Sequence, residues 1–74
     1  RFVQLGAFGS ESAAQRLRIE LAALVTSPIA VSPVESGAGR LYRVRIGPVA
    51  ANEDILQLQQ RLEASGYSGT QLLP

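Results

Sequence analysis

Two short stretches of the chain alternate between apolar and polar residues, the pattern of strands that bury one face of a sheet. In residues 1–8, one face would hold Val3, Leu5 and Ala7, and the other face Phe2, Gln4, Gly6 and Phe8. In residues 40–47, one face would hold Tyr42, Val44 and Ile46, and the other face Leu41, Arg43 and Arg45. We predict two amphipathic strands with apolar faces directed to a core.

A helix is predicted after the first strand. Its apolar stripe recurs every three or four positions and consists of Ala14, Leu17, Leu21 and Leu24. Ser10 or Ser12 suits the N-cap, and Ser12 with Gln15 fits a capping box. The sequence Thr26-Ser27-Pro28 is expected to end this helix.

A second helix is predicted after the strand at 40–47. Asn52 suits its N-cap, and Glu53 and Asp54 suit the positive end of its dipole. Ser65-Gly66 would end it, with glycine just past the last turn. The apolar face of this helix, which we expect to be buried, consists of Ile55, Leu58 and Leu62.

Two further strands complete the pattern. Residues 29–35 (IAVSPVE) contain Pro33, which lacks a backbone donor and therefore favours an edge strand. Residues 36–39 form a hairpin loop, and residues 70–73 suit a short last strand.

A faint repeat with an offset of 41 residues fixes the register of the two halves. It pairs Val3 with Val44, Leu5 with Ile46, Gly6 with Gly47, Ala14 with Ile55, Leu17 with Leu58, and Leu21 with Leu62. The prediction is an α+β fold of the split βαβ type, β-α-β-β-α-β, as in ferredoxin-like and RNP-like domains. Right-handed crossovers place both helices on one face of a four-stranded antiparallel sheet of order 4-1-3-2.

The opposite face of the sheet has no element left to cover it. By alternation it would present Phe2, Gln4, Phe8, Leu41, Arg43, Arg45 and Gln71. This mixture of apolar surface, amides and guanidinium groups suits an extended ligand with nonpolar faces and polar edges. Phe8 could equally close the end of the core, and Arg43 and Arg45 could belong to a solvated face and pair with Glu35 across the hairpin.

Composition limits the chemistry. The 74 residues form one domain at most, and the absence of Cys and His excludes a disulfide framework, a zinc ribbon and the commonest general base. No apolar run is long enough for a membrane span, and we expect no cofactor, metal or catalytic site. A net charge of +1 without any Lys argues against a nucleic-acid partner. The missing initial Met indicates a fragment of a longer protein.

The motifs FVQLGAF at 2–8 and YRVRIGPV at 42–49, separated by a leucine-rich helix, resemble those of the SPOR domain family. The resemblance covers essentially the whole chain, 1–74, as a single domain. It implies the same fold and a noncatalytic peptidoglycan-binding module of the bacterial cell envelope. The expected ligand is denuded glycan, from which amidases have removed the stem peptides, at the division septum in the periplasm.

The resemblance also implies which residues contact glycan. Gln4 and Arg43 match the family's strand residues, and Ala7 stands where some members have Ser. Leu41 stands where some members have an aromatic residue, which weakens a stacking platform. The complete expected set is Gln4, Ala7, Phe8, Gly9, Ser10, Leu41, Arg43, Thr70 and Gln71, with Phe2 and Arg45 as weaker candidates.

The chemistry of these residues agrees with such a ligand. Removal of the stem peptide exposes a lactyl carboxylate, which Arg43 can bind through two charge-assisted hydrogen bonds. Gln4 can donate and accept, which suits an acetamido or hydroxyl group. SPOR domains often end longer envelope proteins, such as those of the rare lipoprotein A family of lytic transglycosylases, and the expected parent is a lipoprotein of that kind.

Two alternatives use the same topology. A single-stranded RNA binder of the RRM type would need aromatic residues on both central strands, where the second offers Leu41, Arg43 and Arg45. A regulatory domain of the ACT type would bind a small molecule or dimerise through an edge strand or helix face. We expect a monomer, because Pro33 protects the edge strand.

Overall fold

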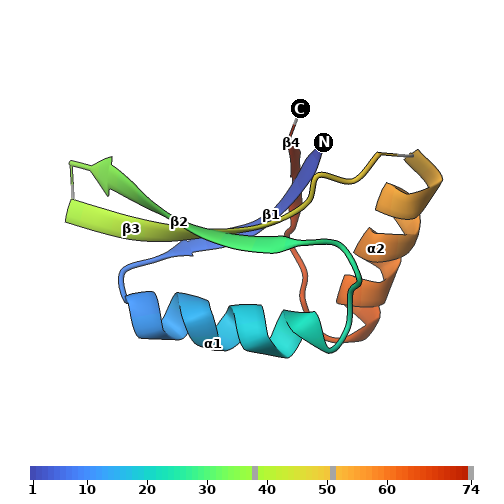
Figure 1. Cartoon of the computed structure of the whole chain (residues 1–74), viewed down its shortest axis with the longest axis horizontal. Coiled ribbons are helices and arrows are strands. Elements are labelled where there is room, and N and C mark those ends of the chain that lie inside the picture. The colour runs from blue at the N-terminus through green and yellow to red at the C-terminus, as the bar shows by residue number, and fades with distance from the viewer. Residues whose placement is uncertain (38, 51, 74) are drawn as a thin grey trace.

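The computed structural model of the chain describes residues 1–37, 39–50 and 52–73, without the side chains of Asn52 and Glu53. Strands and helices follow one another in the predicted order (Figure 1). The elements are β1 (Phe2–Phe8), α1 (Glu11–Ala22), β2 (Ile29–Ser36), β3 (Gly39–Ile46), α2 (Asn52–Ala64) and β4 (Gln71–Leu73). The predicted α+β fold is therefore confirmed.

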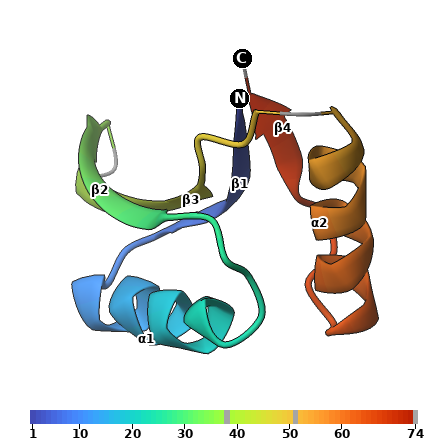
Figure 2. The same cartoon turned by 45° about the vertical axis from the view of Figure 1, so that its right-hand side comes forward.

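The four strands form one antiparallel sheet in the order β2-β3-β1-β4. This is the predicted order, with β1 and β3 in the centre and β2, which contains Pro33, at an edge. The sheet is curved, and both helices lie on its convex side (Figure 2). Helix α1 runs beneath β1, β2 and β3, whereas α2 stands beside β4. No described helix covers the concave face, which is called the open face below.

A β-bulge at Leu5 changes the facing of the second half of β1. Gln4 lies opposite Arg45, yet the next paired residue, Gly6, lies opposite Val44, so Leu5 is the extra residue. An inserted residue reverses the alternation of everything after it. The prediction that Gly6 and Phe8 face away from the helices, and Ala7 toward them, was therefore wrong.

The core lies between the sheet and the helices. Its buried apolar residues are Val3, Ala14, Leu21, Val25, Val44, Ile46, Val49, Ile55, Leu58 and Leu62. Leu5, Leu17 and Phe8 pack against this core while half-buried. Phe8 thus closes one end of the core, the second of the two roles that the sequence left open. Val25 and Val49 were not predicted, because they lie in connections without periodicity.

Helix α1 begins at one of the two predicted caps and ends earlier than predicted. Ser10 is the N-cap, and its Oγ accepts a hydrogen bond of 3.4 Å from the backbone N–H of Ala13. The capping box of Ser12 with Gln15 is not formed, because Gln15 instead accepts a 2.7 Å bond from Arg18 Nε. The helix ends at Ala22, several residues before Pro28.

Helix α2 ends in a Schellman motif. The N–H of Tyr67 donates to Leu62 O at 2.8 Å, and that of Gly66 donates to Glu63 O at 3.0 Å. Gly66 has a φ of 94°, the left-handed conformation that glycine tolerates and this motif requires. The predicted stop at Gly66 is confirmed, whereas the predicted roles of the Asn52 and Glu53 side chains lie outside the described residues.

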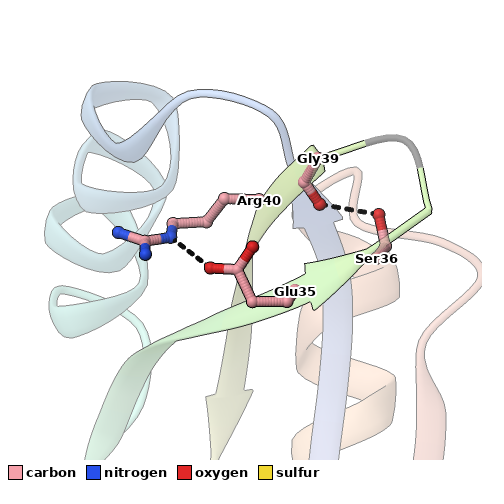
Figure 3. A network of polar contacts seen from close by, with 4 residues as sticks. All are labelled: Glu35, Ser36, Gly39 and Arg40. Carbon is pink, nitrogen blue, oxygen red and sulfur yellow. Dashed lines mark hydrogen bonds and ion pairs between the residues drawn. The ribbon is translucent and has the colours of Figure 1, made fainter.

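The hairpin between β2 and β3 holds the one ion pair found among the described residues. Arg40 Nε and Glu35 Oε1 are 2.7 Å apart, and Ser36 Oγ donates to Gly39 O at 2.8 Å (Figure 3). The hydrogen bond to Glu35 raises the pKa of the Arg40 guanidinium above its usual value. Glu35 therefore pairs with Arg40, not with Arg43 or Arg45 as the alternative from the sequence had it.

Candidate functional site

The open face is built from rows of residues that lie opposite one another on neighbouring strands. One row crosses all four strands and consists of Gln71, Gln4, Arg45 and Ala30. The next row consists of Ala7, Arg43 and Ser32. Phe2 and Leu73 lie at one end of the face, and Leu41 and Val34 lie toward the hairpin. Two polar rows are therefore flanked by apolar residues.

Arg43 occupies the centre of this face. Its neighbours across the strands are Ala7 and Ser32, which are both small, so that the guanidinium has no large side chain directly opposite it. Arg43 Nε is buried and has no hydrogen-bond partner among the described residues. Leaving a buried donor unpaired costs about 1–3 kcal/mol, and a charged group costs more. Arg43 is thus a cationic donor without an internal acceptor.

Arg45 and Gln4 form a pair beside it. Arg45 Nε donates a hydrogen bond of 3.3 Å to Gln4 Oε1, and both side chains are half-buried. Residues two apart on one strand point to the same side, about 6.7 Å apart, so the Arg43 and Arg45 side chains rise next to each other. The acidic residues lie elsewhere, either on the two helices or at Glu35, whose carboxylate Arg40 holds. Among the described side chains, no carboxylate neutralises Arg43 or Arg45.

The bulge at Leu5 decides which residues of β1 join the face. Because Leu5 is inserted, Gln4 and Ala7 share one face although they are three positions apart. Strict alternation would place them on opposite faces. The signal in the sequence was Gly6, since an isolated glycine within a strand often marks a bulge.

Two of the expected contact residues lie on the other side of the sheet. Phe8 and Thr70 line a cavity of about 330 Å³ on the helix side, together with Leu5, Leu17, Gly66, Tyr67 and Ser68. Thr70 precedes β4 and does not belong to it, and it is Gln71 that lies opposite Gln4. The structure therefore separates Phe8 and Thr70 from Gln4, Ala7 and Arg43.

Gly9 and Ser10 lie at the turn between β1 and α1. Both are exposed, but Ser10 Oγ already caps α1 and lies 2.9 Å from Ser12 Oγ. Phe2 and Leu41 are half-buried and lie at the two ends of the open face. The structure thus brings together Phe2, Gln4, Ala7, Leu41, Arg43, Arg45 and Gln71 from the expected set.

Other features of the described residues lie apart from this face. A second cavity of about 300 Å³ is lined by the α1–β2 connection, residues 48–50 and α2. No group of three His, Cys, Asp or Glu side chains is arranged to hold a metal ion in the described part of the chain. Neither described helix has the length and apolar content needed to cross a membrane.

Comparison with known proteins agrees with this geometry. The family model of the SPOR domain matches residues 1–72. The endolytic peptidoglycan transglycosylase RlpA of Pseudomonas aeruginosa, in strains UCBPP-PA14 and PAO1, is 28% identical over 64 residues, which are 86% of this chain and 19% of that protein. The chain therefore spans about a fifth of the length of these relatives.

The similarity extends to three dimensions. The crystal structure of the RlpA SPOR domain from Pseudomonas aeruginosa matches with a TM-score of 0.93 and 26% identity, and the match covers 99% of this chain and 96% of that one. SPOR domains are peptidoglycan-binding modules of the bacterial cell envelope. Because the family model matches nearly the whole chain and the fold is shared throughout, the chain belongs to the SPOR domain family.

Proposed function

We propose that this chain binds denuded glycan strands of peptidoglycan through the open face of its sheet and thereby brings a longer parent protein to the division septum. In this proposal the domain itself performs no catalysis. The chain acts as a monomeric periplasmic module, and its parent is an envelope protein with lytic transglycosylase activity. The proposed contact surface consists of Gln4, Ala7, Leu41, Arg43 and Gln71, with Phe2, Arg45, Gly9 and Ser10 at its border.

The observation that carries the proposal is the unpaired Nε of Arg43. This donor is buried on an open face among small neighbours, and no described acceptor reaches it. Because Nε itself is covered, a carboxylate on the open face would bind the terminal N–H groups of Arg43 and compensate the charge of the guanidinium. Arginine binds a carboxylate through two parallel hydrogen bonds, which gives both affinity and orientation.

The same arrangement supports the proposed preference for glycan without stem peptides. A free lactyl group of N-acetylmuramic acid carries a negative charge, whereas a peptide-bearing one has an amide at that position and additional bulk. Arg43 would therefore lose a charge-assisted bond and meet a steric obstacle on peptide-bearing glycan. Phe2 and Leu41, at the ends of the face, offer nonpolar surface to the C–H faces of sugar rings. We expect modest affinity, because a flexible strand must be ordered on a shallow surface.

Binding to purified sacculi before and after amidase treatment tests the proposal. We expect the bound fraction of the chain to rise markedly after the stem peptides have been removed. Arg43→Ala should abolish this gain, whereas Arg16→Ala, which removes an exposed arginine of α1, should retain it. Circular dichroism of both variants would verify that the fold persists.

Two outcomes would contradict the proposal in different ways. Equal binding to treated and untreated sacculi would exclude selectivity for denuded glycan. Undiminished binding by Arg43→Ala would show that the carboxylate is not held by this arginine. Septal targeting is tested separately, by localising a fluorescent fusion of the chain in dividing cells, where uniform fluorescence along the envelope would contradict it.

A further inference from the structure

The pair formed by Gln4 and Arg45 constrains what the open face can recognise. Gln4 has both a carbonyl oxygen and an amide NH₂, and by itself it could present either to a ligand. Arg45 can only donate hydrogen bonds, and its Nε lies 3.3 Å from Gln4 Oε1. The opposite orientation of the amide would bring NH₂ against N–H, which is repulsive. The pairing chemistry therefore determines the orientation of this amide.

With its oxygen engaged, Gln4 offers the donors of its Nε2 to the surroundings. No described residue accepts a hydrogen bond from this nitrogen. In the neighbouring row, Arg43 contributes a further unpaired donor. Donors thus predominate at the centre of the open face, although the sequence alone allowed Gln4 to act as either partner.

We propose that Arg45 is a positioning residue that holds Gln4 as a hydrogen-bond donor, so that the ligand group bound at Gln4 is an acceptor. This inference rests on the proposed function and deepens it. The group at Gln4 is then a carbonyl or carboxylate oxygen, such as the carbonyl of an N-acetyl group, and the group at Arg43 is an anion. A hydroxyl or amide hydrogen of the ligand would have to share Gln4 Oε1 with Arg45, whereas an acceptor would find both N–H groups of Nε2 free.

The assignment gives Arg45 a role that differs from that of Arg43. Arg43 would contact the ligand, whereas Arg45 would act through Gln4 without needing to touch it. The loss of Arg45 then weakens binding only while Gln4 is present. A simple electrostatic contribution of Arg45 would instead persist after removal of Gln4.

A double-mutant cycle separates these two roles. The probe is peptide-free glycan oligosaccharide released from amidase-treated sacculi, with dissociation constants from isothermal titration calorimetry. We expect Gln4→Met to weaken binding about tenfold and Arg45→Met about fivefold, in the range of one hydrogen bond. The double variant should bind about as well as Gln4→Met alone. Arg45→Lys keeps a hydrogen-bond donor at this position and should bind the oligosaccharide within about twofold of the unmodified chain.

Fully additive losses in the double variant, about fiftyfold together, would overturn the inference, because Arg45 would then act independently of Gln4. Binding by Arg45→Lys that is as weak as binding by Arg45→Met would also contradict the inference. Thermal unfolding of each variant distinguishes these effects from a loss of folded protein. Arg16→Met, on the exposed side of α1, serves as the matched control for removal of an arginine.

A measurement without ligand keeps the inference separate from the proposed function. In ¹³C NMR spectra, Arg45→Met should shift the side-chain carbonyl carbon of Gln4, while that of Gln71 stays in place. An unchanged chemical shift of the Gln4 side-chain carbonyl carbon would show that Arg45 does not hold the amide in solution and would overturn the inference. If the unmodified chain fails to bind the oligosaccharide at all while this shift is observed, the proposed function fails and the orientation of Gln4 stands.

Discussion

Ala7 of β1 lies directly opposite Arg43 of β3, with its methyl group exposed on the open face beside the guanidinium. The two residues meet because the bulge at Leu5 turns Ala7 to this side. Side chains directly opposite in an antiparallel pair have Cβ atoms about 5 Å apart, so a longer residue at position 7 would reach Arg43. This proximity makes Ala7 a position from which the binding of Arg43 can be controlled.

Ala7→Glu should therefore block binding from within the protein. The new carboxylate would pair with Arg43 and occupy the donors that the glycan carboxylate needs, and its charge would repel an anionic ligand. We expect affinity for peptide-free glycan to fall more than about tenfold, measured by calorimetry, with little change in thermal stability. Ala13→Glu, at an exposed position of α1, is the matched control and should bind normally. Normal binding by Ala7→Glu would mean that the ligand does not approach Arg43.

Leu41→Trp should strengthen binding. Leu41 lies on the open face opposite Val34 and is half-buried, so a larger ring there would extend the nonpolar surface available to a sugar. We expect affinity to rise about threefold to tenfold, in the range of one additional aromatic contact. Ile19→Trp, on the exposed side of α1, should leave it unchanged. No gain from Leu41→Trp would place the ligand away from this end of the face.

Gly47→Ala should destabilise the fold strongly. Gly47 has a φ of 145°, and a Cβ added there would lie 2.8 Å from the backbone oxygen of Arg1 and from Phe2 Cδ1. Strain and overlap together are expected to lower the free energy of unfolding by about 2–4 kcal/mol in urea denaturation. Gly9→Ala, where a Cβ would meet no atom within 4 Å, should change it by less than about 1 kcal/mol. Equal stability of the two variants would contradict the observed conformation of Gly47.

Tyr67 should titrate above the usual range. Its hydroxyl donates a 3.0 Å hydrogen bond to Glu20 Oε2, and this bond, with a smaller contribution from burial, raises the pKa of Tyr67 above 10.0. In a Tyr42→Phe background, where Tyr67 is the only tyrosine, Glu20→Ala should lower that pKa, as followed by phenolate absorbance. Glu63→Ala, on α2, is the control.

The sign of the corresponding pH dependence follows from this direction. A tyrosine whose pKa is raised in the folded state favours its neutral form there. Its contribution to stability is therefore present below the unfolded pKa of about 10 and is lost as the pH rises through the higher folded value. A Tyr67 pKa that does not respond to Glu20→Ala would show that the contact between α1 and the segment after α2 is absent in solution.

Local patterns were sufficient for most of the architecture. Alternation in residues 40–47 correctly separated Val44 and Ile46 from Arg43 and Arg45, and Pro33 correctly indicated an edge strand. The 41-residue repeat indicated two similar halves, from which the strand order followed. These inferences succeeded because strand and helix periodicity, the effect of proline and the helix-ending glycine all depend on residues that are close together in the sequence.

Only the tertiary structure decided which face of the sheet the side chains after the bulge in β1 occupy. Whether a strand inserts a residue depends on its pairing with a partner far along the chain, here the register of Gln4 and Gly6 against β3. That register places Ala7 on the open face, Phe8 against the core, and Gln4 within reach of Arg45. The sequence alone determined the elements, their order and the residue types available for binding. The contacts among those residues required the assembled sheet, because hydrogen-bond partners across strands are chosen by long-range pairing.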